Sequence, residues 1–218
     1  GTPAPTETTY GRAGVSGVTT GNLDAMNSAL AVLTVAQTDT VAEIQAVVDA
    51  YLVILAEANG AAADANPAVN PTAAQYALVG ATVAGGLGAN GITLLNDVVG
   101  AKDTTGVDTI AELETLGGAV ARVMATAVSS AATPALTLAD LVALGITGAT
   151  ADLLPAIRNA IAGTADDGSG VNTLGKLQTI VTDAANDAAT ALAQLRDYAG
   201  GTPAPTETTY GRAGVSGV

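Results

Sequence analysis

The side chains best suited to chemistry are carboxylates in two glycine-containing loops. One loop carries Asp103 and Asp108, and the other carries Asp166 and Asp167 followed by Gly168. Hard carboxylate oxygens on a tight turn are what Ca²⁺ requires, so these four aspartates are the candidate metal ligands of the chain. Neither loop reproduces the alternating Asp and Asn residues and the terminal Glu of an EF-hand. Solvated turns that end in helix caps are the simpler interpretation of both loops.

Other routes to catalysis are few. The chain contains no Cys and no His, which removes thiol and imidazole nucleophiles and metal ligation by those groups. Glu43, Glu112 and Glu114 could suggest paired carboxylates for acid–base work, but the first two fit cap positions, and exposed helical acids are usually only solvated charges. We therefore predict a protein that is not an enzyme and that holds no cofactor apart from the candidate calcium.

The overall charge argues against nucleic acid as a partner. Seven Lys and Arg residues stand against 20 Asp and Glu residues, which gives a formal charge of −13 that repels phosphate backbones. The uncharged stretch 76–95 has the length of a membrane span, but it contains five glycines, and the corresponding stretches elsewhere in the chain carry charges. We expect no membrane span in this segment.

The organisation of the chain is repetitive. Residues 1–18 return unchanged at 201–218, so the sequence has a period of 200 residues, as expected for a slice of a tandem array. A weaker repeat of about 65 residues divides each period into three sub-units. The predicted domains are 1–66, 67–131 and 132–200, and 201–218 begins the next period.

Two markers recur in each sub-unit. The first is a Pro-containing entry into a short helix, and the second is a Gly-flanked turn that leads to a medium helix. The equivalent residues are Tyr10, Tyr76 and Leu141 in the first marker, and Asn27, Asn96 and Asn159 in the second. We expect each Asn amide to satisfy backbone groups at a turn within its own sub-unit. We expect the tyrosines to anchor the core with the hydroxyl at its rim; these are Tyr10, Tyr51, Tyr76 and Tyr198.

The third marker begins a long helix. Thr40 with Glu43, and Thr109 with Glu112, fit the capping box, whereas Lys176 replaces the Glu in the third sub-unit, where only half of the box remains. Apolar residues follow at three- and four-residue steps, which predicts one buried stripe for each helix. The stripes are 41, 44, 48, 51 and 55; 110, 113, 116, 120 and 123; and 174, 177, 181, 184, 188, 192 and 195.

These markers predict an all-α fold of tandem three-helix bundles. Pro- and Gly-rich connectors near 59–71, 129–134 and 199–205 separate the bundles. Pro155 lies early in the second helix of the third sub-unit, so that helix either begins late or bends. An immunoglobulin-like sandwich is the alternative fold, but the alternation typical of strands is absent and Ala is frequent.

Three stretches carry a resemblance to a known class of protein. PTETTYGRAGVSGVTTGNLDAMNSAL, LTLADLVALGITGAT and DTVAEIQAVVDA resemble the α-helical tandem repeats of giant bacterial cell-surface proteins, the large adhesins and biofilm matrix proteins. The resemblance implies export, a location at the cell surface or in the extracellular matrix, and a role in a stalk or filament. It carries over no site residues.

The function predicted from these patterns is a structural repeat module of a long extracellular surface protein, a stalk or filament. Its partners are neighbouring copies of the repeat in the same chain and, in a filament, laterally associated identical chains. The alternative is a repeated helical binding module that acts through avidity. A binding face should show exposed aromatic or Arg anchors, but aromatics are scarce and the five Arg residues are scattered along the sequence. The most direct expectation is that residues 201–218 adopt the conformation of residues 1–18.

Overall fold

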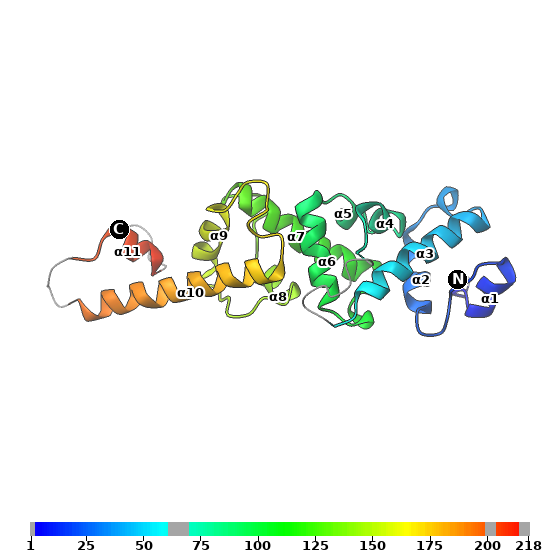
Figure 1. Cartoon of the computed structure of the whole chain (residues 1–218), viewed down its shortest axis with the longest axis horizontal. Coiled ribbons are helices and arrows are strands. Elements are labelled where there is room, and N and C mark those ends of the chain that lie inside the picture. Colours follow the sequence, from blue (N-terminus) through cyan, green and yellow to red (C-terminus); the bar gives the residue numbers. More distant parts are fainter. Residues whose placement is uncertain (1–2, 61–69, 199–203, 214–218) are drawn as a thin grey trace. The chain divides into compact units, whose positions relative to one another are not determined.

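Helices account for all the regular structure in the ranges that can be placed. The computed structural model (Figure 1) describes residues 3–60, 70–198 and 204–213, and within them it contains eleven α-helices, two short 3-10 helices and no strand. The predicted all-α class is confirmed. The helices are α1 (Glu7–Ala13), α2 (Leu23–Val32), α3 (Val41–Glu57), α4 (Ala73–Leu78), α5 (Thr82–Gly85), α6 (Ala89–Gly100), α7 (Ile110–Val128), α8 (Leu138–Ala143), α9 (Leu154–Ala162), α10 (Leu174–Asp197) and α11 (Glu207–Arg212).

The chain divides into two compact units, Gly1–Gly118 and Ala119–Val218, with the boundary inside α7. The first unit holds α1 to α6 and the start of α7, and the second holds the rest of α7 and α8 to α11. The finer division into three sub-units stays a prediction, and parts of the connectors 59–71 and 199–205 lie outside the described residues. We use the names repeat 1, repeat 2 and repeat 3 for residues 1–66, 67–131 and 132–200.

The first helix of every repeat begins in the same way. A threonine hydroxyl accepts the backbone N–H three residues on, and the side chain at that third position returns a bond to the threonine. Such a reciprocal capping box satisfies amides that the first helical turn leaves without a partner. The pairs are Thr6 with Thr9, Thr72 with Gln75, Thr137 with Asp140, and Thr206 with Thr209.

The same short helices also end alike. Gly14, Gly80 and Gly145 lie eight positions after the cap threonines, and their φ angles are +87°, +95° and +82°. Only glycine adopts this left-handed conformation without a steric penalty. The following amide then donates to the carbonyl of the Tyr10, Tyr76 or Leu141 position at 2.9–3.0 Å, which reverses the chain toward the second helix.

Capping boxes also begin two of the long helices, as predicted. In α3, Thr40 Oγ1 accepts from Glu43 N at 3.2 Å, and Glu43 Oε2 accepts from Thr40 N at 2.9 Å. Thr109 and Glu112 repeat this arrangement at α7. At α10 only the threonine half remains, because Lys176 has a cationic side chain that donates instead to Ser169 O and to Asn172 Oδ1.

Burial follows the predicted stripes along most of their length. All five stripe residues of α7 are buried, as are residues 177, 181, 184 and 188 of α10. The exceptions lie toward the helix ends, since Val41 of α3 is 48% exposed and Leu192 of α10 is 60% exposed. Small residues bring backbones close, because a Cβ on Gly117 of α7 would stand 2.9 Å from the Ala84 backbone of α5.

Two further predictions are confirmed by the helix bounds. The uncharged stretch 76–95 is divided among α4, α5 and α6, and among the described residues no helix is long and apolar enough to cross a membrane. The second helix of repeat 3 begins late, at Leu154, so that Pro155 falls in its first turn, where its missing N–H costs nothing.

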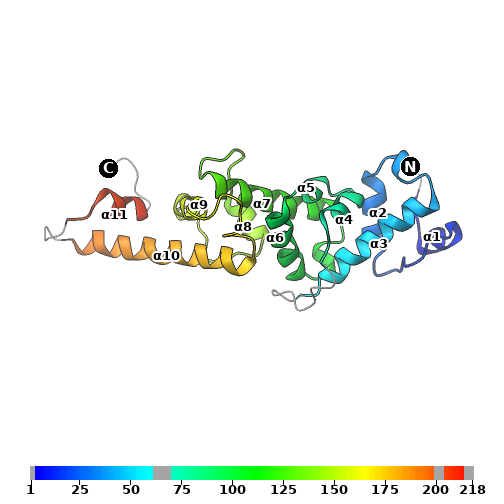
Figure 2. The ribbon, with the colours of Figure 1, turned by 45° about the horizontal axis from the view of Figure 1, so that its top comes forward.

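The start of the second copy of the period reproduces the first copy over the part that can be compared. The N-cap residues Thr6 and Thr206 have nearly the same backbone angles, with φ −104° and −97° and ψ 165° in both. The predicted equivalence is confirmed for the cap and the first turn of the helix, but α11 ends at Arg212, whereas α1 continues to Ala13. Residues 214–218 lie outside the described ranges. Both views show α10 as one continuous helix with α11 packed beside it (Figures 1 and 2).

Candidate functional site

Two of the four candidate calcium ligands, Asp103 and Asp167, form hydrogen bonds within their own turns. Asp103 Oδ1 accepts from the Thr105 hydroxyl at 2.7 Å, and Asp167 Oδ1 accepts from Ser169 N at 2.8 Å. The bond from Ser169 lowers the pKa of Asp167, whereas burial, followed by the nearby Glu112, raises the pKa of Asp108. Asp166 is exposed. In the ranges that the structure describes, no three acidic side chains come together as a metal site requires.

The tyrosine and asparagine markers form one hydrogen-bonded tie in each of the first two repeats. Tyr10 Oη donates to Asn27 Oδ1 at 2.9 Å, and Asn27 Nδ2 donates to Pro5 O at 3.0 Å. In repeat 2, Tyr76 bonds to Asn96 at 2.9 Å, and Asn96 Nδ2 bonds to the carbonyl of residue 71, again at 2.9 Å. These hydrogen bonds connect the second helix of the repeat to its first helix and to the residue that precedes the cap threonine. The prediction that these amides satisfy backbone groups within their own repeat is confirmed for both.

Repeat 3 makes the equivalent contact with a different residue. Arg158 Nε donates to Leu136 O at 2.8 Å, and Arg158 Nη2 donates to the same oxygen. Leu141 has no hydroxyl to hold an amide, and the longer guanidinium reaches the carbonyl directly. The predicted equivalence of Asn159 with Asn27 is therefore wrong by one residue, and the exposed Asn159 side chain lines a cavity instead.

The expectation for the other tyrosines is only partly met. Tyr51 and Tyr76 have no exposed surface, so their hydroxyls lie inside the core rather than at its rim. Burial raises the pKa of both well above the usual phenol value. Tyr198 is 41% exposed at the end of α10, so it is not a core anchor in the described part of the chain.

A second polar contact, which the sequence did not indicate, links each long helix to the turn after the first helix. Gln45 Oε1 accepts from Ser16 N at 2.8 Å, and its Nε2 donates to Ser16 O at 3.2 Å. Gln178 makes the same pair of bonds with Thr147, at 2.9 and 3.0 Å. These partners occupy equal positions, ten residues after the first cap threonine and five after the second.

Repeat 2 replaces the glutamine by Glu114, and the backbone changes to suit it. A carboxylate only accepts, and Glu114 accepts from Thr82 Oγ1 at 3.0 Å and from Val83 N at 3.0–3.1 Å. Both donors belong to the first turn of α5, a helix present only in this repeat among those described. The expectation that Glu114 is merely a solvated acid is wrong.

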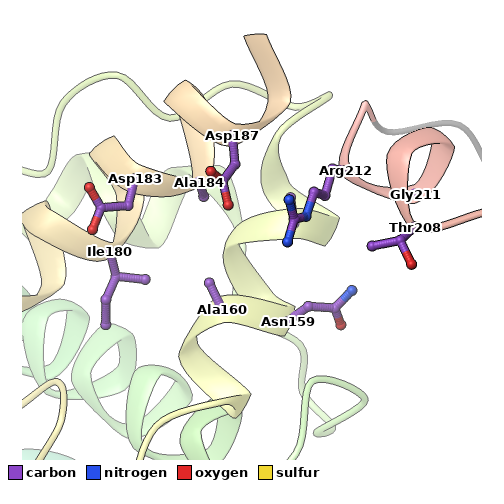
Figure 3. Close-up of a pocket in the computed structure, with 10 residues that line it drawn as sticks. Asn159, Ala160, Ile180, Asp183, Ala184, Asp187, Thr208, Gly211 and Arg212 are labelled. Carbon is purple, nitrogen blue, oxygen red and sulfur yellow. The ribbon is translucent and has the colours of Figure 1, made fainter. Parts of the chain in front are cut away.

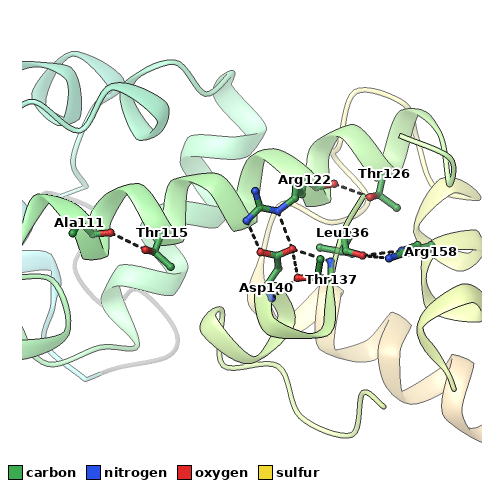
Figure 4. A network of polar contacts seen from close by, with 8 residues as sticks. All are labelled: Ala111, Thr115, Arg122, Thr126, Leu136, Thr137, Asp140 and Arg158. Carbon is green, nitrogen blue, oxygen red and sulfur yellow. Dashed lines mark hydrogen bonds and ion pairs between the residues drawn. The ribbon is translucent and has the colours of Figure 1, made fainter. Parts of the chain in front are cut away.

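A partly buried ion pair joins α7 to α8 in the second unit (Figure 4); the side chain of Arg122 is 29% exposed and that of Asp140 is 8% exposed. Arg122 Nε donates to Asp140 Oδ2 at 2.8 Å, and the same oxygen accepts from Thr137 N at 2.8 Å. Burial opposes ionisation of Asp140, but the bonds from Arg122 and Thr137 outweigh it and lower the pKa of this carboxyl. Asp140 thus combines a helix cap with an inter-helix contact.

Within the first unit, repeat 2 covers a face of repeat 1. Ser28 Oγ on α2 accepts from Ile110 N, the first amide of α7, at 2.8 Å. Tyr51 Oη on α3 donates to Val107 O, in the loop before α7, at 3.0 Å. The residues beside these contacts are fully or almost fully buried: Ala25, Ala29, Val47, Ala50 and Ile54. This covered face is the junction of repeats 1 and 2.

The second unit contains an open cavity of about 450 Å³ between α9, α10 and α11 (Figure 3). The Arg212 side chain reaches from α11 toward the space between Asp187 and Asn159, while Ile180 and Ala160 supply apolar surface (Figure 3). The lining contains one cation, two carboxylates and an amide among small apolar groups. The Thr208 hydroxyl also lines it, and no Ser, Cys, His or Lys is among the described residues of the lining.

Comparison of the chain with protein-family models, with curated proteins and with solved structures found no match.

Proposed function

We propose that this chain is a structural repeat module of a long extracellular surface protein, in which successive copies of the 200-residue period give length to a stalk or filament without catalysis. The observation that carries the proposal is the recurrence of the same contacts at the same positions in the repeats: the capping boxes, the left-handed glycines, and the bonds from Gln45 and Gln178 on the long helices to the turn after the first helix. Each repeat uses its polar side chains to fix its own backbone, which is typical of modules selected for shape.

The finer arrangement that we propose is a tandem series of three-helix bundles. Each repeat contributes a short, a medium and a long helix, to which repeat 2 adds α5, and its internal hydrogen bonds connect the short, medium and long helices. A long helix of about 20 residues spans roughly 30 Å, so three bundles placed end to end would advance the array by about 80–100 Å per period. Stability would accumulate through contacts between neighbours.

A binding module that acts through avidity is the rival function. Hot spots for protein partners are usually rich in Trp, Tyr and Arg. Among the described residues, Tyr198 is the one aromatic side chain in the group of large exposed hydrophobics, and the rest of that group is Val and Leu. This surface favours the architectural role.

The test compares chains of one, two and three periods. Small-angle X-ray scattering and electron microscopy should show a maximum dimension that grows by a constant increment with each added period. Chains that collapse without growing in length would refute the architectural role. Specific capture of one partner with an affinity that rises steeply with period number would favour the binding module instead.

The proposed location has its own experiment. An antibody against the period should label intact source cells or their matrix, and external protease should remove the signal. Labelling that requires permeabilised cells would contradict a surface location while leaving the length measurement unaffected.

A further inference from the structure

We infer that the cavity between α9, α10 and α11 is the docking surface for the following copy of the period, and that residues 23–44 of that copy cover it. This inference rests on the proposed function, since it requires a further period after residue 200. The occupied counterpart is the junction of repeats 1 and 2, where repeat 2 covers α2 and α3 through Ser28 and Tyr51.

The face of α9 that lines the cavity corresponds to the covered face of α2. Asn27 and Arg158 bind equivalent carbonyls, which fixes the alignment of the two helices. Positions 25, 28 and 29 then match 156, 159 and 160, and each set lies on one helical face. Ala29 is fully buried at the junction of repeats 1 and 2, whereas its counterpart Ala160 is exposed in the cavity.

The long helices α3 and α10 show the same difference, in which residues buried in repeat 1 correspond mostly to uncovered residues in repeat 3. Counted from their cap threonines, four cavity-lining residues of α10 match four residues of α3 that are at most 3% exposed. Of the four on α10, only Ala184 is buried, and both aspartates are exposed. The matched pairs are Val47 with Ile180, Ala50 with Asp183, Tyr51 with Ala184, and Ile54 with Asp187.

The complementary surface is uncovered at the start of the period. Ile110 of α7, which bonds to Ser28 at the junction of repeats 1 and 2, is 4% exposed, and Leu113 one turn further along is 0% exposed. Their counterparts in α3 are Val41, which is 48% exposed, and Ile44, which is half-buried. The face of α9 and α10 is thus uncovered at the end of the period, and the face of α3 is uncovered at its start. These two faces correspond to the two sides of the junction of repeats 1 and 2.

The hydrogen bond between Ser28 and the Ile110 amide at the junction of repeats 1 and 2 has a chemical counterpart at the cavity. The Ile110 amide is the first of its helix and has no acceptor within that helix, so Ser28 of the preceding repeat supplies one. Val41 holds the same first position in α3. Asn159 occupies the Ser28 position, and its side-chain oxygen can accept from the Val41 amide of the following copy.

The first helix of the following copy, α11, already packs on α10. Helix α11 packs on α10 as α4 packs on α3. Tyr210 is half-buried there, whereas the identical Tyr10 is 4% exposed and bonded to Asn27. Residue 27 of the following copy would complete the same tie, which brings its second helix directly to the cavity.

Charge distinguishes this boundary from the internal junction. At the cavity, Asp183 and Asp187 occupy the positions that Ala50 and Ile54 hold in repeat 1. Arg212 occupies the position of Leu78, so its guanidinium faces the two carboxylates. The two carboxylates and the guanidinium are opposite in charge and therefore complementary. The surface is therefore adapted to the first repeat of a period rather than to the second.

The test uses a two-period chain, in which residues 1–200 are followed by a full copy of residues 1–218. Because the chain has no cysteine, single cysteines can carry spin labels at Thr182 of the first copy and Val35 of the second. The equivalent exposed pair in the single chain, Asp49 and Thr104, supplies the reference for an occupied junction. Electron–electron double resonance should give one narrow distance peak that matches this reference.

Two arginine substitutions in the first copy decide whether the cavity itself is responsible. Ala160→Arg fills the cavity and should replace the narrow peak with a broad distribution. Ala189→Arg is the matched control, because Ala189 and its counterpart Ala56 are both exposed, and it should leave the peak unchanged. Circular dichroism of the Ala160→Arg chain should show full helicity, since Ala160 is a surface residue.

A broad distribution in the unsubstituted two-period chain would overturn the docking surface, as would a narrow peak that survives Ala160→Arg. Neither result bears on the proposed function, because an array with flexible joints still gains length with each period. Conversely, failure of the length measurement would remove the proposed function, whatever the spin labels report.

Discussion

The Tyr76 hydroxyl donates to Asn96 Oδ1 at 2.9 Å in a site where Tyr76 has no exposed surface and Asn96 is only 6% exposed. Tyr76→Phe leaves a buried amide oxygen without its donor, and we expect a loss of roughly 1–3 kcal/mol in the free energy of unfolding. Tyr10→Phe is the matched variant. Because Asn27 is only half-buried, water can replace the donor there and the loss should be smaller. Urea denaturation measures both variants, and equal losses would contradict the role of burial.

The glycine turns provide a second matched pair. Gly80→Ala and Gly145→Ala both force a Cβ onto a left-handed backbone, at a cost of about 1–2 kcal/mol. The new Cβ at position 80 would also stand 2.6 Å from Val32 Cγ2, whereas position 145 has open space. Gly80→Ala should therefore be clearly more destabilising. A thermal unfolding midpoint that falls equally in both variants would show that the Val32 contact adjusts without cost.

The carboxylate of Glu114 should matter for α5 in particular. Glu114→Gln removes the negative charge that faces the first turn of that helix, and we expect a loss of about 0.3–1 kcal/mol. Hydrogen exchange at the amides of α5 should accelerate more than exchange elsewhere in the first unit. Gln178→Glu in repeat 3 is the converse test. A carboxylate cannot donate to Thr147 O, so this substitution should also destabilise the chain.

Acid should weaken the contact of α7 with α8 through Asp140. Its pKa is below the ordinary value of 3.8 in the folded chain, so its ionised form contributes stability that is present above pH 3.8. That contribution is lost as the pH falls through the lowered pKa. Asp140→Asn should destabilise the chain by roughly 1–3 kcal/mol at neutral pH. The difference from the unsubstituted chain should shrink in acid.

Urea denaturation between pH 7 and pH 2 measures this dependence. Asp197→Asn is the control, because the Arg196–Asp197 pair is 67–74% exposed and exposed pairs contribute little. A difference for Asp140→Asn that does not change with pH would contradict the assignment of the lowered pKa to this carboxyl.

The features predicted correctly from the sequence are those encoded within a few residues. A capping box needs only a threonine and a glutamate three positions apart, and Thr40–Glu43 and Thr109–Glu112 both form one. Pro155 predicts either a late start or a bend in α9, and the late start is the outcome. The all-α class follows from apolar steps of three and four residues over long stretches.

The features that were missed depend on partners far along the chain. Agreement of residue type favours Asn159 as the counterpart of Asn27, although the position relative to the bonded carbonyl identifies Arg158. Leu136 and Arg158 are 22 residues apart, as are Pro5 and Asn27. The contacts of Gln45 and Glu114 join positions 29–32 residues apart. Because no local pattern marks such distant partners, a glutamine or glutamate on a helix is read from the sequence as an ordinary solvated residue. The regularity of the glutamine contacts lies in the position counted from each cap threonine, ten residues for Ser16 and Thr147 and five residues for Gln45 and Gln178.

The aspartates at 183 and 187 have a consequence for how the number of repeats in the chain can change. If recombination removed one repeat of about 65 residues, the face with Asp183 and Asp187 could meet a helix that carries Leu78 instead of Arg212, and two carboxylates would be buried without a cation. Removing or adding 200 residues at once leaves every boundary as it was. Natural length variants should therefore differ by whole periods, and gene sequences from related isolates provide the count.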